Sequence, residues 1–346
     1  MNTSTPAATA FDALPVTEQL GRVKNLARQA LPLYGLPFDS DISLLNYSEN
    51  ATWLVKPPPE TPNLFPKRVL RINRPGYNPR PNINTELDWV LAIRRDTPII
   101  TADPIPGLDG EFVQHIWHKD VPQPRNCVLL TFLEGVQPDE TNRRAAFQLL
   151  GDVTARLHKH VLNWRPPRPL HRLLWNFDNL IGPNAYWGNW RDNPDLDAPT
   201  RALIERALPL IQKRVTALGT DPDRFNLIHA DLRDANLLIH NGQVAAIDFD
   251  DCGFSWFMHD LAAALSFMET APDAPDCVDA WFTGYNKIRT LSKPERDELD
   301  TFILLRRLQL TAWIGSHADT AQARSVRPGH AAGTALLCEK YLRKHA

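Results

Sequence analysis

A strand, loop and hairpin pattern between residues 225 and 251 is the feature that most restricts how this chain folds. Three apolar runs there have the length and composition of buried strands. The runs are residues 225–228, 237–239 and 244–247. The pair Asn241-Gly242 between the last two runs is typical of a tight hairpin turn. The polar residues on either side therefore lie on loops at one end of the hairpin, where we expect Asp231, Asn236 and Asp248 close together.

The side chains on these loops are of the types that phosphoryl transfer from a nucleotide requires. A carboxylate receives the hydroxyl proton, and oxygen atoms of an Asp and an Asn hold a magnesium ion. Three motifs follow in order, H-x-D-x(4)-N from His229, I-D-F-D-D from Ile247 and H-D-L-A from His259. An isolated Asp beside a strand is most often a turn or cap residue. The ordered set favours the chemical interpretation.

Length, charge and cysteine content restrict the class of protein further. With 346 residues the chain can form about two domains. The formal net charge of −2 argues against binding to nucleic acid or to a membrane surface. Four cysteines without a C-x-x-C pair indicate reduced thiols in a cytoplasmic protein and argue against structural zinc. The N-terminal residues have the pattern of neither a signal peptide nor a membrane span.

The three motifs resemble the catalytic core of the aminoglycoside phosphotransferase and choline kinase superfamily, whose members are relatives of the protein kinases. The resemblance covers roughly residues 20–320 and looks closest to the homoserine kinase type II and stress-response kinase branch. It implies an α+β, two-lobed protein-kinase-like fold, with an antiparallel five-stranded sheet in the small lobe and a large, mainly helical lobe. We expect residues 1–133 to form the N-terminal lobe, including an N-terminal helix, and residues 134–346 the C-terminal catalytic lobe.

Hydrophobic periodicity predicts an element order that agrees with such a fold. A first helix is expected to begin at Thr17 and to reach Leu31, and a second helix to begin at Asn84 or Thr85. The expected strands are residues 42–45, 52–55, 68–72, 111–117 and 127–132. The expected later helices are residues 141–160, 200–218, 258–269, 275–285, 293–318 and 331–345.

The resemblance also implies roles for the loop residues. Asp231 is the expected catalytic base, and Arg233 is expected to stabilise charge on the transferring phosphoryl group. The expected metal ligands are Asn236, Asp248 and Asp250. The residues expected to support the catalytic loop are His229 and Asp260. A solvated surface position stays open for Arg233 and Asp250.

Five residues are expected to bind the nucleotide: Ser48, Asn50, Arg71, Glu86 and Glu134. Arg71 stands where the superfamily normally has Lys, and Glu86 follows fifteen residues later, which fits an ion pair that aligns the cation on phosphates. The loop at Ser48 lacks a G-x-G-x-x-G pattern, so its side chains would have to contact phosphate. Glu134 belongs to the expected connector, whose backbone could bind an adenine edge. A surface role for Arg71 stays open.

An aromatic stretch at residues 171–190 falls where related proteins build their acceptor pocket. The residues expected to contact the substrate are Trp175, Asp178, Trp187 and Trp190. Rings beside acids hold ammonium groups through cation–π contacts, although core packing also explains such rings. We therefore expect transfer of the γ-phosphate of ATP, with Mg²⁺, to a hydroxyl of a small amine-bearing alcohol. An amino acid, an amino alcohol and an aminoglycoside all fit that description.

Two other functions stay open, a bacterial stress-response-type protein Ser/Thr kinase and a non-catalytic nucleotide-binding module. Only seven residues separate Asp251 from His259, which leaves little room for a peptide-docking segment and favours a small substrate. The presence of both acids and the amide of the loop motifs argues against a module without turnover. The sequence predicts no nucleic-acid or membrane partner and is silent on the oligomeric state.

Overall fold

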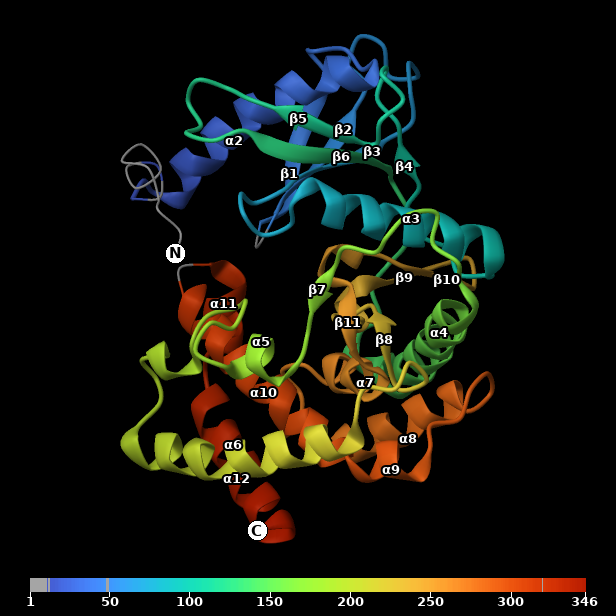
Figure 1. Ribbon diagram of the computed structural model, residues 1–346. Helices are drawn as coiled ribbons and strands as arrows, with labels where there is room; N and C mark the ends of the chain where they lie inside the picture. The colour runs from blue at the N-terminus through green and yellow to red at the C-terminus, as the bar shows by residue number, and fades with distance from the viewer. Residues whose placement is uncertain (1–10, 12, 48–49, 319) are drawn as a thin grey trace. The chain divides into compact units, whose positions relative to one another are not determined.

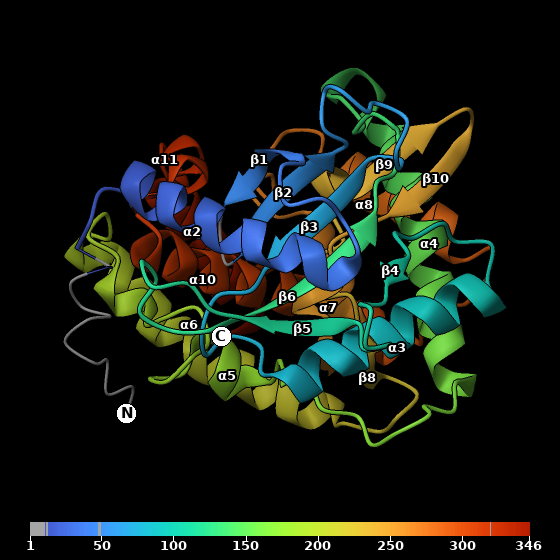
Figure 2. The same cartoon turned by 90° about the horizontal axis from the view of Figure 1, so that it is seen from above.

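The computed structural model describes residue 11 and residues 13–47, 50–318 and 320–346 (Figure 1, Figure 2). The chain forms two compact units. Unit 1 lies within residues 1–91, 101–134 and 166–171, and unit 2 within residues 92–100, 135–165 and 172–346. Two short segments therefore interrupt a simple division of the sequence. The single lobe boundary expected after residue 133 stays a prediction.

Unit 1 is built around an antiparallel sheet. The N-terminal elements are α2 (Val16–Ala30), a 3₁₀ turn η1 (Leu31–Tyr34), β1 (Asp41–Tyr47), β2 (Ala51–Lys56), β3 (Arg68–Ile72), α3 (Arg80–Asp96), β4 (Pro104–Ile105), β5 (Val113–Ile116) and β6 (Arg125–Thr131). The strand order is β1-β2-β3-β6-β4, and β5 pairs with β6 as well. The sheet therefore has six strands and not the five expected, because the two-residue strand β4 is too short to leave a periodic pattern in the sequence.

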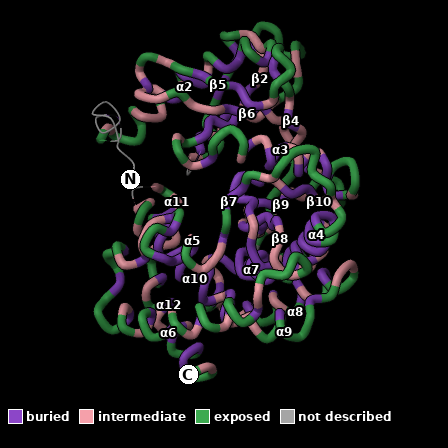
Figure 3. Tube along the Cα trace, in the orientation of Figure 1, coloured by how far each residue is buried: buried purple, intermediate pink, exposed green. Residues whose placement is uncertain are grey.

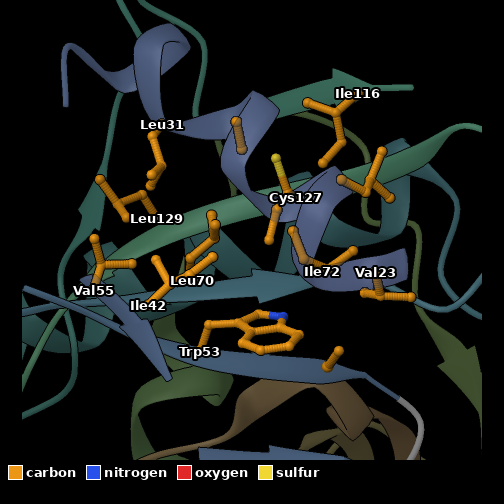
Figure 4. Close-up of a cluster of buried hydrophobic side chains, with 14 of the residues drawn as sticks. Val23, Leu31, Ile42, Trp53, Val55, Leu70, Ile72, Ile116, Cys127 and Leu129 are labelled. Atoms are coloured by element: carbon orange, nitrogen blue, oxygen red, sulfur yellow. The ribbon is translucent and has the colours of Figure 1, made fainter. Parts of the chain in front are cut away.

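Two helices cover opposite faces of this sheet (Figure 1). Val23 and Leu31 pack with Leu70, Ile72 and Leu129 in one cluster, which Figure 4 shows in close-up. The other cluster joins α3 to the opposite face and consists of Ile83, Leu87, Val113 and Val128. Side chains alternate between the two faces of a strand, so the residue between Leu70 and Ile72 faces α3. That residue is Arg71.

Unit 2 is mainly helical. Its helices are α4 (Arg143–Asn163), α5 (Phe177–Ile181), α6 (Ala198–Leu218), α7 (Phe257–Ala264), α8 (Ala274–Tyr285), α9 (Lys293–Asp297), α10 (Leu299–Ser316), α11 (Ala321–Val326) and α12 (His330–His345). Its strands are β7 (Leu173–Leu174), β8 (Phe225–Ile228), β9 (Leu237–His240), β10 (Gln243–Ala246) and β11 (Gly253–Trp256). Four 3₁₀ turns complete the list, η2 (Glu140–Asn142), η3 (Trp190–Asp192), η4 (Asp234–Asn236) and η5 (Phe249–Asp251).

The small strands position the polar loops. β9 and β10 form the antiparallel hairpin that the Asn241-Gly242 turn predicts, and this prediction is confirmed. β8 pairs with β11, a strand that the sequence did not predict, and β11 also pairs with β7 in parallel. The loop after β8 and the loop after β10 therefore start from two separate small sheets.

Several helix boundaries differ from those expected. α7 ends at Ala264, five residues before the expected end. Phe267, which follows it, has a left-handed φ of 69°, and a right-handed helix cannot continue through such a residue. The single helix expected at 293–318 is two helices, because the chain breaks at Glu298 between α9 and α10. The first strand is longer than expected and α3 begins four residues earlier, at Arg80.

Helix α10 is enclosed on almost every side, and its residues from Thr301 to Ile314 are buried with the exception of Ile303 (Figure 3). It packs against α7 and α12. Two arginines, Arg306 and Arg307, therefore lie in the interior of unit 2. Among the described residues, no helix is both long and apolar enough to span a bilayer.

Candidate active site

The loop that follows β8 has a strained backbone held by a buried acid. Ala230 has a φ of 67°, in the left-handed region that a residue with a Cβ rarely adopts. Asp260, at the start of α7, accepts a hydrogen bond from the Ala230 amide at 2.8 Å and another from the His229 amide at 3.3 Å. Asp260 is fully buried, so it holds the backbone just before Asp231 without solvent competition.

Asp260 is in turn held by a histidine of α4. The His158 Nε2 lies 2.9 Å from a carboxylate oxygen of Asp260, and its Nδ1 lies 2.9 Å from the Tyr285 hydroxyl. Burial raises the pKa of Asp260, but hydrogen bonding, by His158 above all, outweighs burial and leaves the pKa below its usual value. Burial also lowers the pKa of His158. The arrangement therefore fits a carboxylate that accepts from a neutral imidazole. His158 was not predicted, since a histidine within a helical pattern has no distinguishing signal.

His229 braces the two polar loops against each other. Its Nε2 lies 3.1 Å from the Ile247 carbonyl, and its Nδ1 accepts from the Asp231 amide at 3.4 Å. Its ring is fully buried and lies 4.5 Å from the ring of Phe249 between centroids. These contacts require the tautomer with the proton on Nε2. His229 thus links the catalytic loop to the segment that carries Asp248.

Asp231 is surrounded by two arginines and an amide. Arg306 Nη2 lies 2.5 Å from Oδ1, whereas Arg233 Nε lies 3.6 Å from Oδ2. Asn236 Nδ2 donates to the Asp231 carbonyl at 2.8 Å and to Oδ2 at 3.1 Å. The Asp231 side chain retains 19% of its exposure, so an acceptor can still reach it. The sequence analysis missed Arg306. Two arginines within an otherwise apolar helix were the available signal, because such residues are buried only with a partner.

The two predicted metal ligands lie on loops joined by backbone bonds. The Ile247 amide donates to the Asn236 carbonyl at 3.0 Å, which places Asp248 beside the catalytic loop. Because the NH₂ group of Asn236 points to Asp231, its side-chain oxygen is the atom available to a cation. Asp248 has a left-handed φ of 65°, which an Asp tolerates better than most residues. Carboxylate and amide oxygens fit Mg²⁺, whose remaining ligands are usually water and phosphate.

Residues that precede α5 hold the segment after Asp248 by hydrogen bonds to its carbonyl groups. Arg172 donates to the carbonyls of Asp250 and Cys252, and Trp175 Nε1 donates to the Asp251 carbonyl at 2.8 Å. Asp250 is buried within η5. In the described residues, no group of three or more His, Cys, Asp and Glu could hold a metal ion. A site built from Asn236 and Asp248 thus depends on oxygens of the ligand, and Asp250 as a third ligand stays a prediction.

In unit 1, the predicted nucleotide residues have distinct surroundings. Arg71 forms a bidentate ion pair with Glu86, with both N···O distances 2.8 Å and both side chains buried. Asn50 is buried and its Oδ1 accepts from Asn73 Nδ2 and from the Arg74 amide, each at 3.3 Å. Glu134 is exposed and pairs with Lys67 at 2.8 Å. Ser48 lies outside the described residues.

The predicted acceptor residues are mostly enclosed. Trp175 and Trp190 are each 1% exposed, and Trp190 lies 4.3 Å from the guanidinium of Arg191. Trp187 is buried too, and the cation over its ring is Arg306 at 5.0 Å. Asp178 is exposed in the first turn of α5. The rings therefore have cationic or hydrogen-bonded partners within the chain, and their contact with an acceptor stays a prediction.

A catalytic loop with an acid five residues before an amide, followed by a hairpin and a second acid, defines a class of protein, the protein-kinase-like phosphotransferases. Residues 44–300 match the model of the phosphotransferase enzyme family, APH. The chain belongs to this family.

Comparison with individual proteins agrees with that membership. The microcompartment-associated aminopropanol kinase is 36% identical, with a TM-score of 0.83 over 93% of this chain and 98% of that one. The amicoumacin kinase hAmiN, solved with AMP-PNP, Ca²⁺ and Ami, has a TM-score of 0.72 at 20% identity over 95% of this chain and 96% of that one, which shows the shared fold. Homoserine kinase from Gluconobacter oxydans (strain 621H) is 30% identical over 58% of this chain and 64% of that protein. The matches span between 56% and 66% of the curated relatives.

Proposed function

We propose that the protein transfers the γ-phosphate of ATP to a hydroxyl group of a small amine-bearing alcohol, with Mg²⁺ as the metal. The observation that carries the proposal is the junction at Asn236. Its NH₂ group contacts Asp231 at 2.8 and 3.1 Å, and its backbone carbonyl accepts from Ile247, the residue before Asp248. A base and two oxygen ligands for a metal are thus joined in one network, which is the set that phosphoryl transfer requires.

In this proposal, each group has one task. Asp231 orients the acceptor hydroxyl and receives its proton, which leaves late in a largely dissociative transition state. Asn236 and Asp248 hold Mg²⁺, which neutralises phosphate charge when the nucleotide is bound. Arg71, fixed by Glu86, holds nucleotide phosphates in place of the usual Lys. Support for ATP and a divalent cation comes from hAmiN, the structurally similar kinase solved with AMP-PNP and Ca²⁺.

The acceptor class rests on the relatives and on the exposed acid of α5. The relative with 36% identity is an aminopropanol kinase, and Asp178 offers a carboxylate that can pair with an ammonium group. All four cysteines are buried free thiols, which fits a reducing compartment, and we propose the cytoplasm. Trp187 is the ring that we propose nearest the acceptor, because Arg306 links it to Asp231.

A screen for ADP release tests the proposal. Purified protein with ATP and Mg²⁺ is offered amino alcohols, homoserine, aminoglycosides and a generic protein substrate, and acceptor-free protein measures background hydrolysis. We expect acceptor-dependent turnover with an amino alcohol, homoserine or an aminoglycoside. Turnover with the protein substrate alone would establish a protein kinase instead. Nucleotide binding with no acceptor-dependent turnover would indicate a binding module.

The amine is tested with the best acceptor and its N-acetylated analogue. Loss of the positive charge should lower kcat/KM at least about tenfold, since a charge-assisted contact contributes on the order of 1.4 kcal/mol or more. Equal kcat/KM values would remove the amine from the proposal and leave phosphoryl transfer to a hydroxyl group unaffected.

A further inference from the structure

A buried arginine of α10 occupies one oxygen of the proposed base. Arg306 is 1% exposed and makes four hydrogen bonds in addition to its contact with Trp187. Its Nε donates to Ser266 Oγ at 3.0 Å, and its Nη1 donates to Gln309 Oε1 at 3.0 Å and to the Ala230 carbonyl at 3.4 Å. Its Nη2 donates to Asp231 Oδ1 at 2.5 Å. The guanidinium is therefore fixed in position and direction before any substrate binds.

This arrangement makes the two oxygens of Asp231 unequal. Oδ1 faces the buried Arg306, whereas Oδ2 faces the amide of Asn236 and, at 3.6 Å, Arg233. Because the carboxylate cannot rotate without breaking the short contact to Arg306, Oδ2 is the oxygen left to meet a hydroxyl group. The same arginine also holds the carbonyl of Ala230, the residue with the left-handed backbone. Burying a guanidinium is costly unless its hydrogen bonds are satisfied, and here two of the four go to Asp231 and to the carbonyl of the residue before it.

We propose that Arg306 is a positioning residue for phosphoryl transfer, which fixes Asp231 so that Oδ2 receives the proton of the acceptor hydroxyl. The inference rests on the proposed function, because it assigns Arg306 a role only if Asp231 is the base. Misplacing a catalytic group by about 1 Å costs on the order of a hundredfold in rate. The effect of Arg306 should therefore appear in kcat and not in nucleotide affinity.

The neighbouring residue on α10 provides a matched control. Arg307 is 3% exposed and pairs with the buried Glu269 at 2.7 Å, so it is an equally enclosed arginine with a carboxylate partner. It also donates to the His330 carbonyl at 2.7 Å, on α12. Loss of the Arg307 guanidinium leaves the buried carboxylate of Glu269 without this partner, and loss of the Arg306 guanidinium leaves Asp231 with fewer hydrogen bonds. Both changes should therefore lower the melting temperature. Only the change at Arg306 alters the surroundings of Asp231.

The experiment compares Arg306→Gln, Arg306→Lys and Arg307→Gln in the full chain. We expect Arg306→Gln to lower kcat roughly tenfold to a hundredfold, with the KM for ATP within a few-fold of wild type. Arg306→Lys keeps the charge without the fork and should recover part of the loss. Arg307→Gln should lower the melting temperature with kcat near that of wild type. If Arg306→Gln does not fold, Arg306→Lys decides the matter, and a wild-type kcat in that variant would overturn the proposal.

A double-mutant cycle with Asp231→Asn separates this inference from the proposed function. If Arg306 acts through Asp231, Arg306→Gln should cause no further loss of kcat in the Asp231→Asn background. A further loss as large as that in wild type would overturn the positioning role. Activity retained in Asp231→Asn alone would contradict the proposed function itself, whereas a lost activity there with a fully active Arg306→Gln would contradict only the inference.

Discussion

Two arginine–carboxylate pairs, one in each unit, differ in what they leave accessible. In unit 1, Arg71 takes both oxygens of Glu86 at 2.8 Å, and both side chains are 5% exposed or less. In unit 2, Arg306 takes one oxygen of Asp231 at 2.5 Å, and Asp231 stays 19% exposed. In the first pair, which we call the closed pair, both oxygens of the Glu86 carboxylate hold the Arg71 guanidinium. In the second pair, which we call the open pair, the cation holds one oxygen of a partly exposed carboxylate, and the second oxygen is the one that we propose accepts the proton.

The largest expected effect concerns the closed pair. Glu86→Ala leaves Arg71 buried without its carboxylate, which typically destabilises a protein by about 3 to 5 kcal/mol. Asp231→Ala should cost less, because Arg306 keeps three other hydrogen bonds and the Asp231 side chain is partly open to water. Urea unfolding of both variants measures the difference. Equal losses would mean that the two pairs do not differ in the way their exposure indicates.

Next in size is the removal of Asp248, the proposed metal ligand on the loop beside the open pair. Asp248→Ala should abolish the tightening of ATP binding by Mg²⁺, an effect on the order of a hundredfold, because the ion loses a protein oxygen that holds it against the phosphates. Calorimetric titration with ATP, with and without Mg²⁺, measures it. The account is wrong about Asp248 if Mg²⁺ tightens binding equally in the variant and in wild type.

The two pairs also show how far the sequence determines the site. Arg71 and Glu86 belong to a strand and the helix that follows it, and the family resemblance, which their spacing fits, implied their pairing. Arg306 lies 75 residues after Asp231 on a helix buried on almost all sides, where periodicity gives no direction for any side chain. The hairpin turn had a local signal, Asn241-Gly242, and was confirmed. Strand β11 pairs with distant strands and was missed.

The same reasoning explains the aromatic residues. The sequence shows that Trp175 and Trp187 are near each other along the chain, but it does not show which residues contact their rings. In the fold, Trp175 donates to the Asp251 carbonyl and Trp187 lies against Arg306. Both contacts join segments more than 70 residues apart. Tertiary contacts of this range leave no pattern in one sequence, so the cation that the chain itself places over Trp187 could not be predicted, and contact of these rings with an acceptor stays a prediction.

Acid should destabilise the region around the open pair. Burial, with a contribution from the Arg306 charge, lowers the pKa of His259 to about 3, and burial with Arg307 lowers the pKa of His330 to about 3. Below about pH 6.5 the unfolded chain binds protons at these histidines while the folded chain does not. Stability should therefore fall as pH drops from about 6.5 toward 3, by up to about 1.4 kcal/mol per pH unit for each histidine.

Urea midpoints between about pH 7 and pH 5 measure this dependence. His259→Gln should reduce the slope of the unfolding free energy against pH by one histidine's share, since it removes one of the buried histidines whose pKa is lowered. An unchanged slope in that variant would show that His259 is not a source of the acid sensitivity.

The smallest effect is expected from a conservative change in the closed pair. Arg71→Lys keeps a cation beside Glu86 and restores the residue usual in the family, so kcat and the KM for ATP should stay within about tenfold of wild type. Arg71→Met, which removes the charge at similar volume, serves as the control and should weaken ATP more. Equal, negligible effects of both changes on ATP would assign the phosphates to another cation.

The central claim is that Asp231 is the base and that its Oδ2 accepts the proton of the acceptor hydroxyl. The most direct measurement is the kcat of Asp231→Asn with the best acceptor, together with its Kd for ATP in the presence of Mg²⁺. The account predicts a loss of at least about a hundredfold in kcat with a Kd within a few-fold of wild type. Turnover close to that of wild type would contradict it.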